Sequence, residues 1–425
     1  MRITLFIGLI LWLTACGVGN PLVLPTDTPP PPTFTPAPTA TSTPAPDSIL
    51  GFTEFLAQTE SLRPPQRQDL VNRYTAQLAK TPITGDNQAI FLWLGAAESV
   101  AVIGDMNGWK ATETSMLTRL EGTDLWYLVA EFEPNARLEY QFLVNGEEPN
   151  LDPLNPKTIK SLNKPNSVLA MPGYETPTEL LPSEMVIPQG MITSHTIDSS
   201  YVNQTRTFFV YEPAGQIVGG KLPTIYFNNG TQYLNLIDTP AILDSLIAKR
   251  IIPPLIAVFV PPINISQEYM LEDAYVAFLA DELVPYVQQT YDADPNPEKT
   301  GVMGSSLGGL AAVYTAFTRP DVFGLAAGQS GDYGVNENKL IQLVKRQQAG
   351  TANSQPVRYY LVSGTYETAD GDESGTILVA NRRLAEALDT TDQVFLYEER
   401  PEGQSLGLVE GTIGRALAFL YGNPD

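Results

Sequence analysis

A strand–serine–helix pattern in the second half of the chain constrains the fold more than any other feature. Residues 304–308 read Gly-Ser-Ser-Leu-Gly and fit the G-x-S-x-G pattern. A short apolar stretch leads into them from Gly301, and a helical pattern follows over residues 311–318. The two glycines allow a sharp turn without Cβ clashes, and such a turn raises a serine hydroxyl above the edge of a sheet. The sequence therefore predicts a nucleophile elbow that carries Ser306.

A reactive serine of this kind needs donors for the negative charge that develops on its substrate. The first N–H groups of the helix after Ser306 have no partner within the helix, and they include that of Leu307. In folds with such an elbow, a second donor comes from the loop after an earlier strand. Here that loop follows Phe227, and we expect its donors at Asn229, Gly230 or Thr231.

Strands and helices alternate over the region that contains the elbow, which we place at residues 190–425. Continuous apolar runs such as 255–260 are typical of parallel strands that are covered on both faces. We expect strands at 205–211, 224–227, 255–260, 357–362 and 394–397, and helices at 274–289, 380–388 and 412–421. The predicted fold class is α/β, with the mostly parallel sheet of an α/β-hydrolase flanked by helices.

A β-rich stretch precedes this domain. Four strands are expected, at 89–94, 99–104, 126–130 and 138–144, with a strong turn at Asn145-Gly146. Short strands without helices predict a small immunoglobulin-like β-sandwich over residues 87–173. We expect Trp93, Trp109 and Trp126 to be packing residues, the usual role of aromatic side chains. A helical lead-in over 47–86, capped by Asp47, comes before the sandwich, and a Pro-containing linker over 174–189 follows it.

The N-terminus is typical of an export signal. Arg2 supplies the positive end, and an apolar stretch of about a dozen residues follows, which is shorter than the ~20 residues a membrane-spanning helix needs. Residues 13–16, Leu-Thr-Ala-Cys, resemble the bacterial lipobox, in which the cysteine is acylated and the signal is cut before it. We predict a signal over 1–15, lipidation at Cys16, a Pro/Thr-rich tether over 16–46 and an extracytoplasmic, lipid-anchored body.

Composition excludes several classes of partner. The formal net charge is −22, which disfavours contact with nucleic acid. One Cys and one His cannot form a Cys/His metal site, so we expect no metal and no cofactor. The acidic run 370–373 lacks the spacing of a calcium-binding loop, and we interpret it as a solvated turn.

Two families share longer motifs with this chain. Residues 104–109, Gly-Asp-Met-Asn-Gly-Trp, with Leu125-Trp126, Tyr140-Gln141-Phe142 and Asn145-Gly146, resemble the immunoglobulin-like early-set domain that precedes glycogen-branching enzymes and some esterases. The region 191–422 resembles the enterochelin-esterase-like (esterase D) family. Its shared motifs are Arg206 with 210–213, Glu268-Tyr269, 282–286, 304–309, 329–331, 364–367 and 381–384. The resemblance implies a serine hydrolase of carboxylic esters, such as siderophore, feruloyl or acetyl esters.

The chain departs from the esterase family at its general base. Relatives carry a Gly-His pair before the final helix, whereas this chain has Gln404 after Gly403. A glutamine amide cannot accept the serine proton at neutral pH. The acid is expected after the strand at 357–362, at Glu367, which fits the family's Gly-x-x-Glu, or at Asp370. The loop after Phe227 reads Asn228-Asn229-Gly230 where relatives often have His-Asp-Gly.

The only histidine does not fit the role of the general base. His195 precedes Ser306 in the chain, whereas the α/β-hydrolase order is serine, acid, histidine. We expect His195 to be structural. Three functions remain open: a surface-tethered esterase with an atypical base, a catalytically impaired relative that binds a ligand or carbohydrate in the same cleft, and a sugar-binding or scaffold lipoprotein. The expected ligand is a small ester or a carbohydrate-linked ester.

Overall fold

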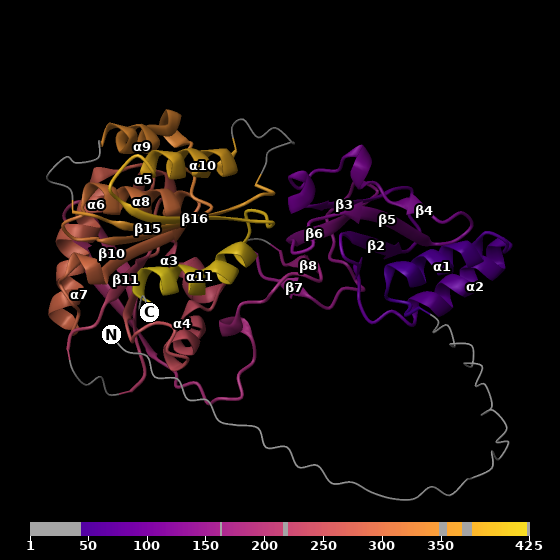
Figure 1. The fold of residues 1–425 in the computed structure, drawn as a ribbon, viewed down its shortest axis with the longest axis horizontal. Helices are drawn as coiled ribbons and strands as arrows, with labels where there is room; N and C mark the ends of the chain where they lie inside the picture. Colours follow the sequence, from indigo (N-terminus) through magenta and orange to yellow (C-terminus); the bar gives the residue numbers. More distant parts are fainter. Residues whose placement is uncertain (1–43, 162–163, 216–219, 348–354, 368–375, 423–425) are drawn as a thin grey trace, which may run out of the picture. The chain divides into compact units, whose positions relative to one another are not determined.

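Three β-sheets organise the part of the chain that the structure describes, residues 44–161, 164–215, 220–347, 355–367 and 376–422 of a computed structural model. Two four-stranded sheets come first, and an eight-stranded sheet follows them (Figure 1). All three lie in one compact unit that begins at Pro44. The signal, Cys16 and most of the predicted tether lie outside the described residues.

Two helices open this unit. Helix α1 (Ile49–Thr59) is capped by Ser48, whose hydroxyl accepts the N–H of Gly51 at 3.0 Å. The predicted cap, Asp47, is therefore wrong by one residue. Pro64 and Pro65 begin helix α2 (Pro64–Thr75), where a missing N–H removes no helical bond. Both helices bury aromatic residues against strands of the first sheet.

The two small sheets form the predicted sandwich. One sheet has the order β1-β2-β5-β4, from β1 (Ile83–Thr84), β2 (Gln88–Leu94), β5 (Leu125–Glu131) and β4 (Thr118–Arg119). The other has the order β3-β6-β8-β7, from β3 (Val100–Gly104), β6 (Arg137–Val144), β8 (Asn166–Ala170) and β7 (Thr158–Ile159). Short 3₁₀ turns lie at η1 (Asp105–Asn107) and η2 (Glu113–Ser115).

The three tryptophans of the sandwich do not share one role. Trp126 is buried in the core between the two sheets, and Trp93 packs against the same core. Trp109 follows η1 with φ of 63°, and it is 36% exposed. The expectation that Trp109 is a packing residue is wrong, because the turn at Gly108 carries its ring out of the sandwich core.

The large sheet has the strand order β16-β15-β14-β13-β11-β12-β10-β9. Its strands from β12 to β16 are parallel, and β9 and β10 pair antiparallel at one edge. Their bounds are β9 (Met191–Ser199), β10 (Gln204–Glu212), β11 (Thr224–Phe227), β12 (Ile256–Phe259), β13 (Thr300–Ser305), β14 (Leu325–Gln329), β15 (Arg358–Gly364) and β16 (Val394–Arg400). The predicted α/β fold class is confirmed. The run 325–329, which the sequence did not single out, supplies β14.

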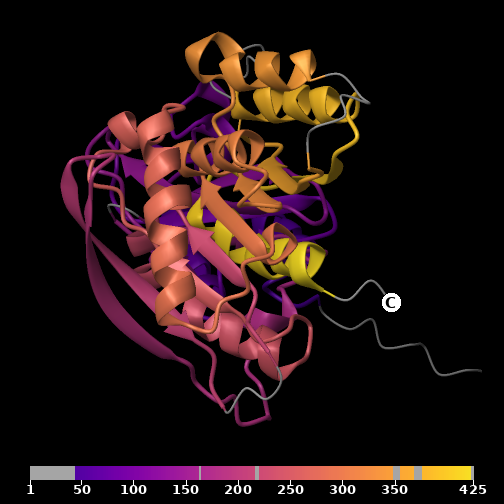
Figure 2. The same ribbon diagram turned by 90° about the vertical axis from the view of Figure 1, so that its left-hand side faces the viewer.

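Helices cover both faces of this sheet (Figures 1 and 2). One apolar layer packs α3 (Gly230–Asn235), α4 (Thr239–Ala248) and α11 (Leu406–Tyr421) on the sheet. The other packs α6 (Asp273–Ala277), α7 (Val284–Thr290), α8 (Leu307–Thr318), α9 (Val335–Arg346) and α10 (Ile377–Leu388). The helix expected at 274–289 is α6 and α7 joined by a π-helical stretch, η4 (Phe278–Leu283).

Short elements complete the fold. They are α5 (Ile265–Glu268), η3 (Thr178–Leu180) in the region expected to be a linker, and η5 (Pro297–Lys299). Among the described residues, none of the helices combines the length and the hydropathy that a bilayer crossing requires.

Candidate active site

Ser306 lies on the turn between β13 and α8. Its backbone has φ of 51° and ψ of −125°, a conformation that a non-glycine residue adopts only when its surroundings impose it. Its N–H donates to the carbonyl of Gln329 on the neighbouring strand at 3.0 Å. The neighbouring glycines are required by space: a Cβ on Gly304 would lie 2.3 Å from the carbonyl oxygen of Gly308. This is the geometry of a nucleophile elbow.

The loop after β11 reaches the elbow from the side. A Cβ on Gly308 would lie 1.7 Å from Oδ1 of Asn229, so this loop touches the first turn of α8. The buried side chain of Asn228 donates to the carbonyl of Gly308 at 3.0 Å and accepts from the hydroxyl of Tyr275 at 2.8 Å. These bonds hold the loop and the helix N-terminus together.

The expected oxyanion donors differ in their surroundings. Leu307 begins α8 and lines the cleft in front of Ser306. The N–H of Gly230 donates to the carbonyl of Val260 at 3.0 Å, and that of Asn229 donates to the hydroxyl of Tyr269 at 2.8 Å. Thr231 is exposed. Of these groups, the geometry leaves the N–H of Leu307 best placed to meet an oxyanion.

Glu367 occupies the position expected of the acid, after β15. It is 7% exposed, and one of its carboxylate oxygens accepts a hydrogen bond from the hydroxyl of Ser330. The other oxygen, Oε2, is buried without a hydrogen-bond partner. Burial raises the pKa of Glu367 to about 7, and the nearby carboxylates of Asp105 and Glu402 act in the same direction. The alternative acid, Asp370, lies outside the described residues.

Gln404 lies on the loop between β16 and α11 and lines the same cleft as Ser306. Its side chain is exposed. The next residue, Ser405, caps α11 by accepting the N–H of Leu408 at 3.2 Å. This cap starts α11 at 406, before the predicted 412, and places Gln404 on the loop just before the capping residue.

His195 lies elsewhere. It is on the edge strand β9, and β10, β12 and β11 separate that strand from β13. Its ring stacks on Phe208, and its two nitrogens lie 3.1 and 2.5 Å from the hydroxyls of Tyr286 and Tyr291. Both ring nitrogens thus lie beside tyrosine hydroxyls at the edge of the sheet, with three strands between β9 and β13, which leads into Ser306.

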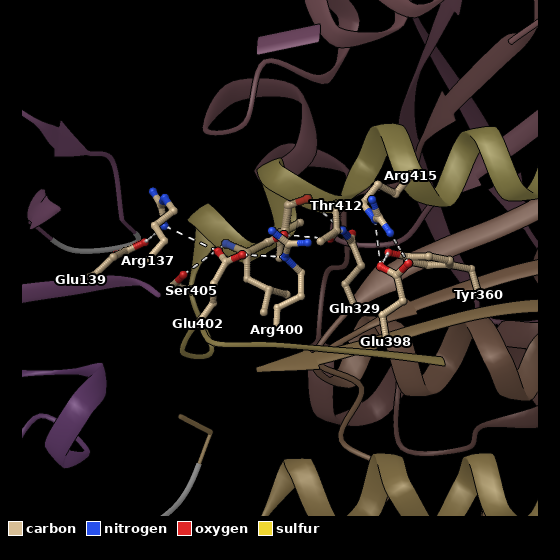
Figure 3. A network of polar contacts seen from close by, with 12 residues as sticks. Arg137, Glu139, Gln329, Tyr360, Glu398, Arg400, Glu402, Ser405, Thr412 and Arg415 are labelled. Carbon is tan, nitrogen blue, oxygen red and sulfur yellow. Dashed lines mark hydrogen bonds and ion pairs between the residues drawn. The ribbon is translucent and has the colours of Figure 1, made fainter. Parts of the chain in front are cut away.

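Residues of the β-sandwich bind the loop that carries Gln404 through a hydrogen bond and ion pairs (Figure 3). The N–H of Arg137 on β6 donates to the carbonyl of Pro401 at 3.0 Å, and Arg137 pairs with Glu402 at 3.9 Å and Glu139 at 3.7 Å. Glu139 in turn accepts the N–H of Gly407 at 3.3 Å. The two folded regions therefore meet directly beside the expected position of the base.

The cleft in front of Ser306 has a volume of about 530 Å³ and is lined from both regions. The sandwich contributes Asp105, Trp109 and Glu139, none of which the sequence analysis placed in the site. A Cβ on Gly403 would lie 2.2 Å from the carboxyl carbon of Asp105, so Asp105 sits against the residue before Gln404. The 104–109 motif was the only part of the sequence analysis that pointed to Asp105 and Trp109. A contact between two separate regions of the fold leaves no periodic pattern in the sequence, so the motif did not place these residues beside Ser306.

The raised pKa of Glu367 predicts a stability that depends on pH. A carboxyl with a higher pKa in the folded than in the unfolded state stabilises the fold fully below the unfolded pKa, and this contribution is lost as the pH rises through about 7. Relative to Glu367→Gln, the wild type should lose up to about 3 kcal/mol of unfolding free energy between pH 4.5 and pH 8. Urea titrations across this range measure the difference.

Glu399→Gln is the control for this titration. The bond from Arg382 lowers the pKa of Glu399, so its contribution has the opposite sign and is lost as the pH falls. If the unfolding free energies of the wild type and of Glu367→Gln change in parallel from pH 4.5 to pH 8, Glu367 is not a buried carboxyl with a raised pKa.

A serine elbow on β13, an acidic residue after β15 and a cleft loop after β16 together define the α/β-hydrolase class. Residues 199–403 match the family model described as "Putative esterase", and residues 79–157 match "Carbohydrate-binding module 48 (Isoamylase N-terminal domain)". The chain thus consists of an esterase-family domain behind a carbohydrate-binding-module-48, early-set-like domain, and both resemblances seen in the sequence are confirmed.

Named relatives support this assignment. The iron(III) enterobactin esterase of Escherichia coli K12 is 21% identical over 360 residues, which is 74% of this chain and 85% of the relative. The structure of ferric enterobactin esterase from Salmonella typhimurium has a TM-score of 0.67 at 19% identity and covers 78% of this chain and 93% of its own. That of the Shigella flexneri enzyme in the presence of enterobactin has a TM-score of 0.64 at 20% identity, covering 79% and 94%. At these identities the structures show the shared fold.

Proposed function

We propose that this chain is a lipid-anchored, extracytoplasmic member of the esterase family that binds an ester at Ser306 and hydrolyses it feebly. The observation that carries the proposal is that Gln404 lines the cleft where a histidine is needed, while His195 lies beyond three intervening strands. Attack by Ser306 on an ester carbonyl forms an O–C bond and releases the hydroxyl proton. An amide has no lone pair basic enough to take that proton at neutral pH.

The other parts of the site support binding. The elbow and the N-terminus of α8 present the N–H of Leu307 to a carbonyl oxygen, and the bonded loop 228–230 holds that helix end in place. The relatives named above are esterases of iron(III) enterobactin. For this chain we propose a small ester or a carbohydrate-linked ester as ligand. A binding protein without catalysis is the second candidate, favoured by the half-exposed Trp109 in the cleft.

A fluorophosphonate probe tests the proposed function, because it reacts with a serine in proportion to its activation. We expect slow labelling of the wild type and none of Ser306→Ala. Ser305→Ala is the matched control, since Ser305 lines the same cleft and is the last residue of β13, and it should label as the wild type does. Rapid labelling of the wild type, together with fast turnover of aryl esters, would contradict the proposed impairment.

The anchor is proposed from Cys16 and is tested separately. Cys16 is the only cysteine, and it stands where a lipobox requires it. Bacteria that express the chain and are fed a labelled fatty acid should incorporate the label into the wild type and not into Cys16→Ser. Equal labelling of both proteins would refute the lipid anchor without touching the site at Ser306.

A further inference from the structure

The cleft at Ser306 is lined by acidic groups and by no basic side chain among the residues that the structure describes. Asp105 and Glu139 both reach its wall, and they are 5% and 2% exposed. Asn229 also lines the cleft, although its Oδ1 is buried against Gly308 without a hydrogen-bond partner. A ligand that fills this cleft therefore meets oxygen atoms and partial or full negative charge.

The negative charge behind this wall is only partly neutralised. Four buried carboxylates lie there, those of Asp105, Glu139, Glu367 and Glu402. Arg137 pairs with Glu139 and Glu402, and Arg400 pairs with Glu402, so among the described residues these ion pairs reach two of the four carboxylates. The contacts of Arg137 are long, 3.7 and 3.9 Å, and its Nη1 forms no hydrogen bond. Burial, with the charge of Glu139, raises the pKa of Asp105 to about 7. A cation in the cleft would relieve this excess of like charge.

Trp109 adds an aromatic side chain to the lining of the cleft, next to Asp105. Its indole N–H donates to Oδ1 of Asp105 at 3.1 Å, and Oδ2 of Asp105 accepts the N–H of Glu139 at 2.7 Å. The carboxylate thus fixes the ring by its edge, and 36% of the residue stays exposed beside the cleft. An indole face next to carboxylates is a combination that attracts organic cations, through the ring quadrupole and through charge.

We propose that the ester bound at Ser306 carries an organic ammonium group, which is seated between Trp109 and the carboxylates of Asp105 and Glu139. This inference rests on the proposed ester-binding function and names the class of its ligand. A sugar ester could also use a tryptophan and carboxylates, but it would leave the excess charge unrelieved. The charge of the cleft therefore favours the ammonium ester.

Two isosteric esters test the proposal on the full-length protein in detergent micelles. Acetylcholine carries a trimethylammonium group, and 3,3-dimethylbutyl acetate has an uncharged tert-butyl group of the same shape. Calorimetry at pH 8 should show at least about tenfold tighter binding of the cation. The preference should shrink toward pH 5, because Asp105 and Glu367 take up protons while the guanidinium group of Arg137 stays charged.

Substitutions test which side chains produce the preference for the cation. Trp109→Leu should remove most of the preference for the cation and leave the affinity for the neutral ester nearly unchanged, and Asp105→Asn should lower the preference as well. Tyr201→Leu is the control, since Tyr201 is 43% exposed on the β9–β10 turn, at the other edge of the sheet. It should bind both esters as the wild type does.

The outcomes separate this inference from the proposed function. Equal affinity for the two isosteres, tighter binding of a methyl glucoside acetate, or failure to bind either isostere while the fluorophosphonate still labels Ser306 would overturn the ammonium class alone. Loss of both probe labelling and ester binding would overturn the ester site together with the inference built on it.

Discussion

Gln404→His should raise the rate of aryl ester hydrolysis by about two to three orders of magnitude over the wild type. Loss of a triad histidine elsewhere lowers kcat by about a million-fold, and a retained oxyanion hole still gives ~10³–10⁴ over water. Residue 404 and Ser306 line one cleft, and we expect an imidazole at 404 to approach the serine hydroxyl. The expected gain is smaller than the full factor because the loop 228–230 also differs from relatives.

The new ring needs an orienting acceptor, and Glu367 can supply one. Its Oε2 is buried without a partner, whereas the other oxygen is held by Ser330. Since the pKa of Glu367 is about 7, its carboxylate is available only above that pH, and the rescued activity should rise across pH 7. Ser330→Ala added to Gln404→His should move this rise in activity to higher pH, because the bond from Ser330 lowers the pKa of Glu367.

Steady-state kinetics on 4-nitrophenyl acetate measure the rescue. Gln404→Ala is the matched control and should stay at the wild-type rate, and Gln404→His with Ser306→Ala should fall back to it. A folded Gln404→His variant no faster than Gln404→Ala would show that residue 404 does not stand where the base acts. Fast wild-type turnover that Ser306→Ala abolishes would show that this chain uses another base.

Arg206→Met should destabilise the folded protein by about 3–5 kcal/mol, because it leaves a buried carboxylate without its cation. Arg206 and Glu268 are 1% and 6% exposed, and they form two hydrogen bonds of 2.8 and 2.9 Å. Glu268 also accepts the N–H groups of Ile263 and Asn264 at 2.9 Å, so it fixes the segment before α5.

This pair also bears on the site. The segment that Glu268 fixes leads into α5, whose first residue, Ile265, lines the cleft. Tyr269 follows α5, and its hydroxyl accepts the N–H of Asn229. Arg206→Met should therefore also slow fluorophosphonate labelling of Ser306. The same change at a partly exposed pair, Arg382→Met beside Glu399, is the control and should cost about 0–1 kcal/mol.

Urea unfolding of the variants gives these free energies. Because Glu268→Gln keeps an acceptor for the two backbone N–H groups and removes the charge, Arg206→Met with Glu268→Gln should be less destabilised than Arg206→Met alone. A loss below 1 kcal/mol in Arg206→Met, equal to that of the Arg382 control, would show that the buried pair has little influence on stability.

The sequence by itself determined the fold class, and it predicted the nucleophile elbow at Ser306. Buried parallel strands require unbroken apolar runs, and the elbow requires glycines at 304 and 308, so both leave a local pattern in the chain. The resemblance to the esterase family identified the absence of a histidine near 404, because relatives carry a Gly-His pair between the last strand and the final helix. Cap and boundary errors, such as Asp47 for Ser48, arose where two neighbouring residues offer equivalent oxygens.

Only the tertiary structure decided what surrounds Ser306. Asp105 and Trp109 lie some 200 residues before the elbow, and only the packing of the sandwich on the loop before α11 brings them into its cleft. Two hydrogen bonds likewise join segments that are distant in the sequence. One runs from Ser330 to Glu367, and the other from the N–H of Gly230 to the carbonyl of Val260. Such contacts depend on how side chains from distant elements share buried space, charge and hydrogen bonds, and no local pattern in the sequence encodes that sharing.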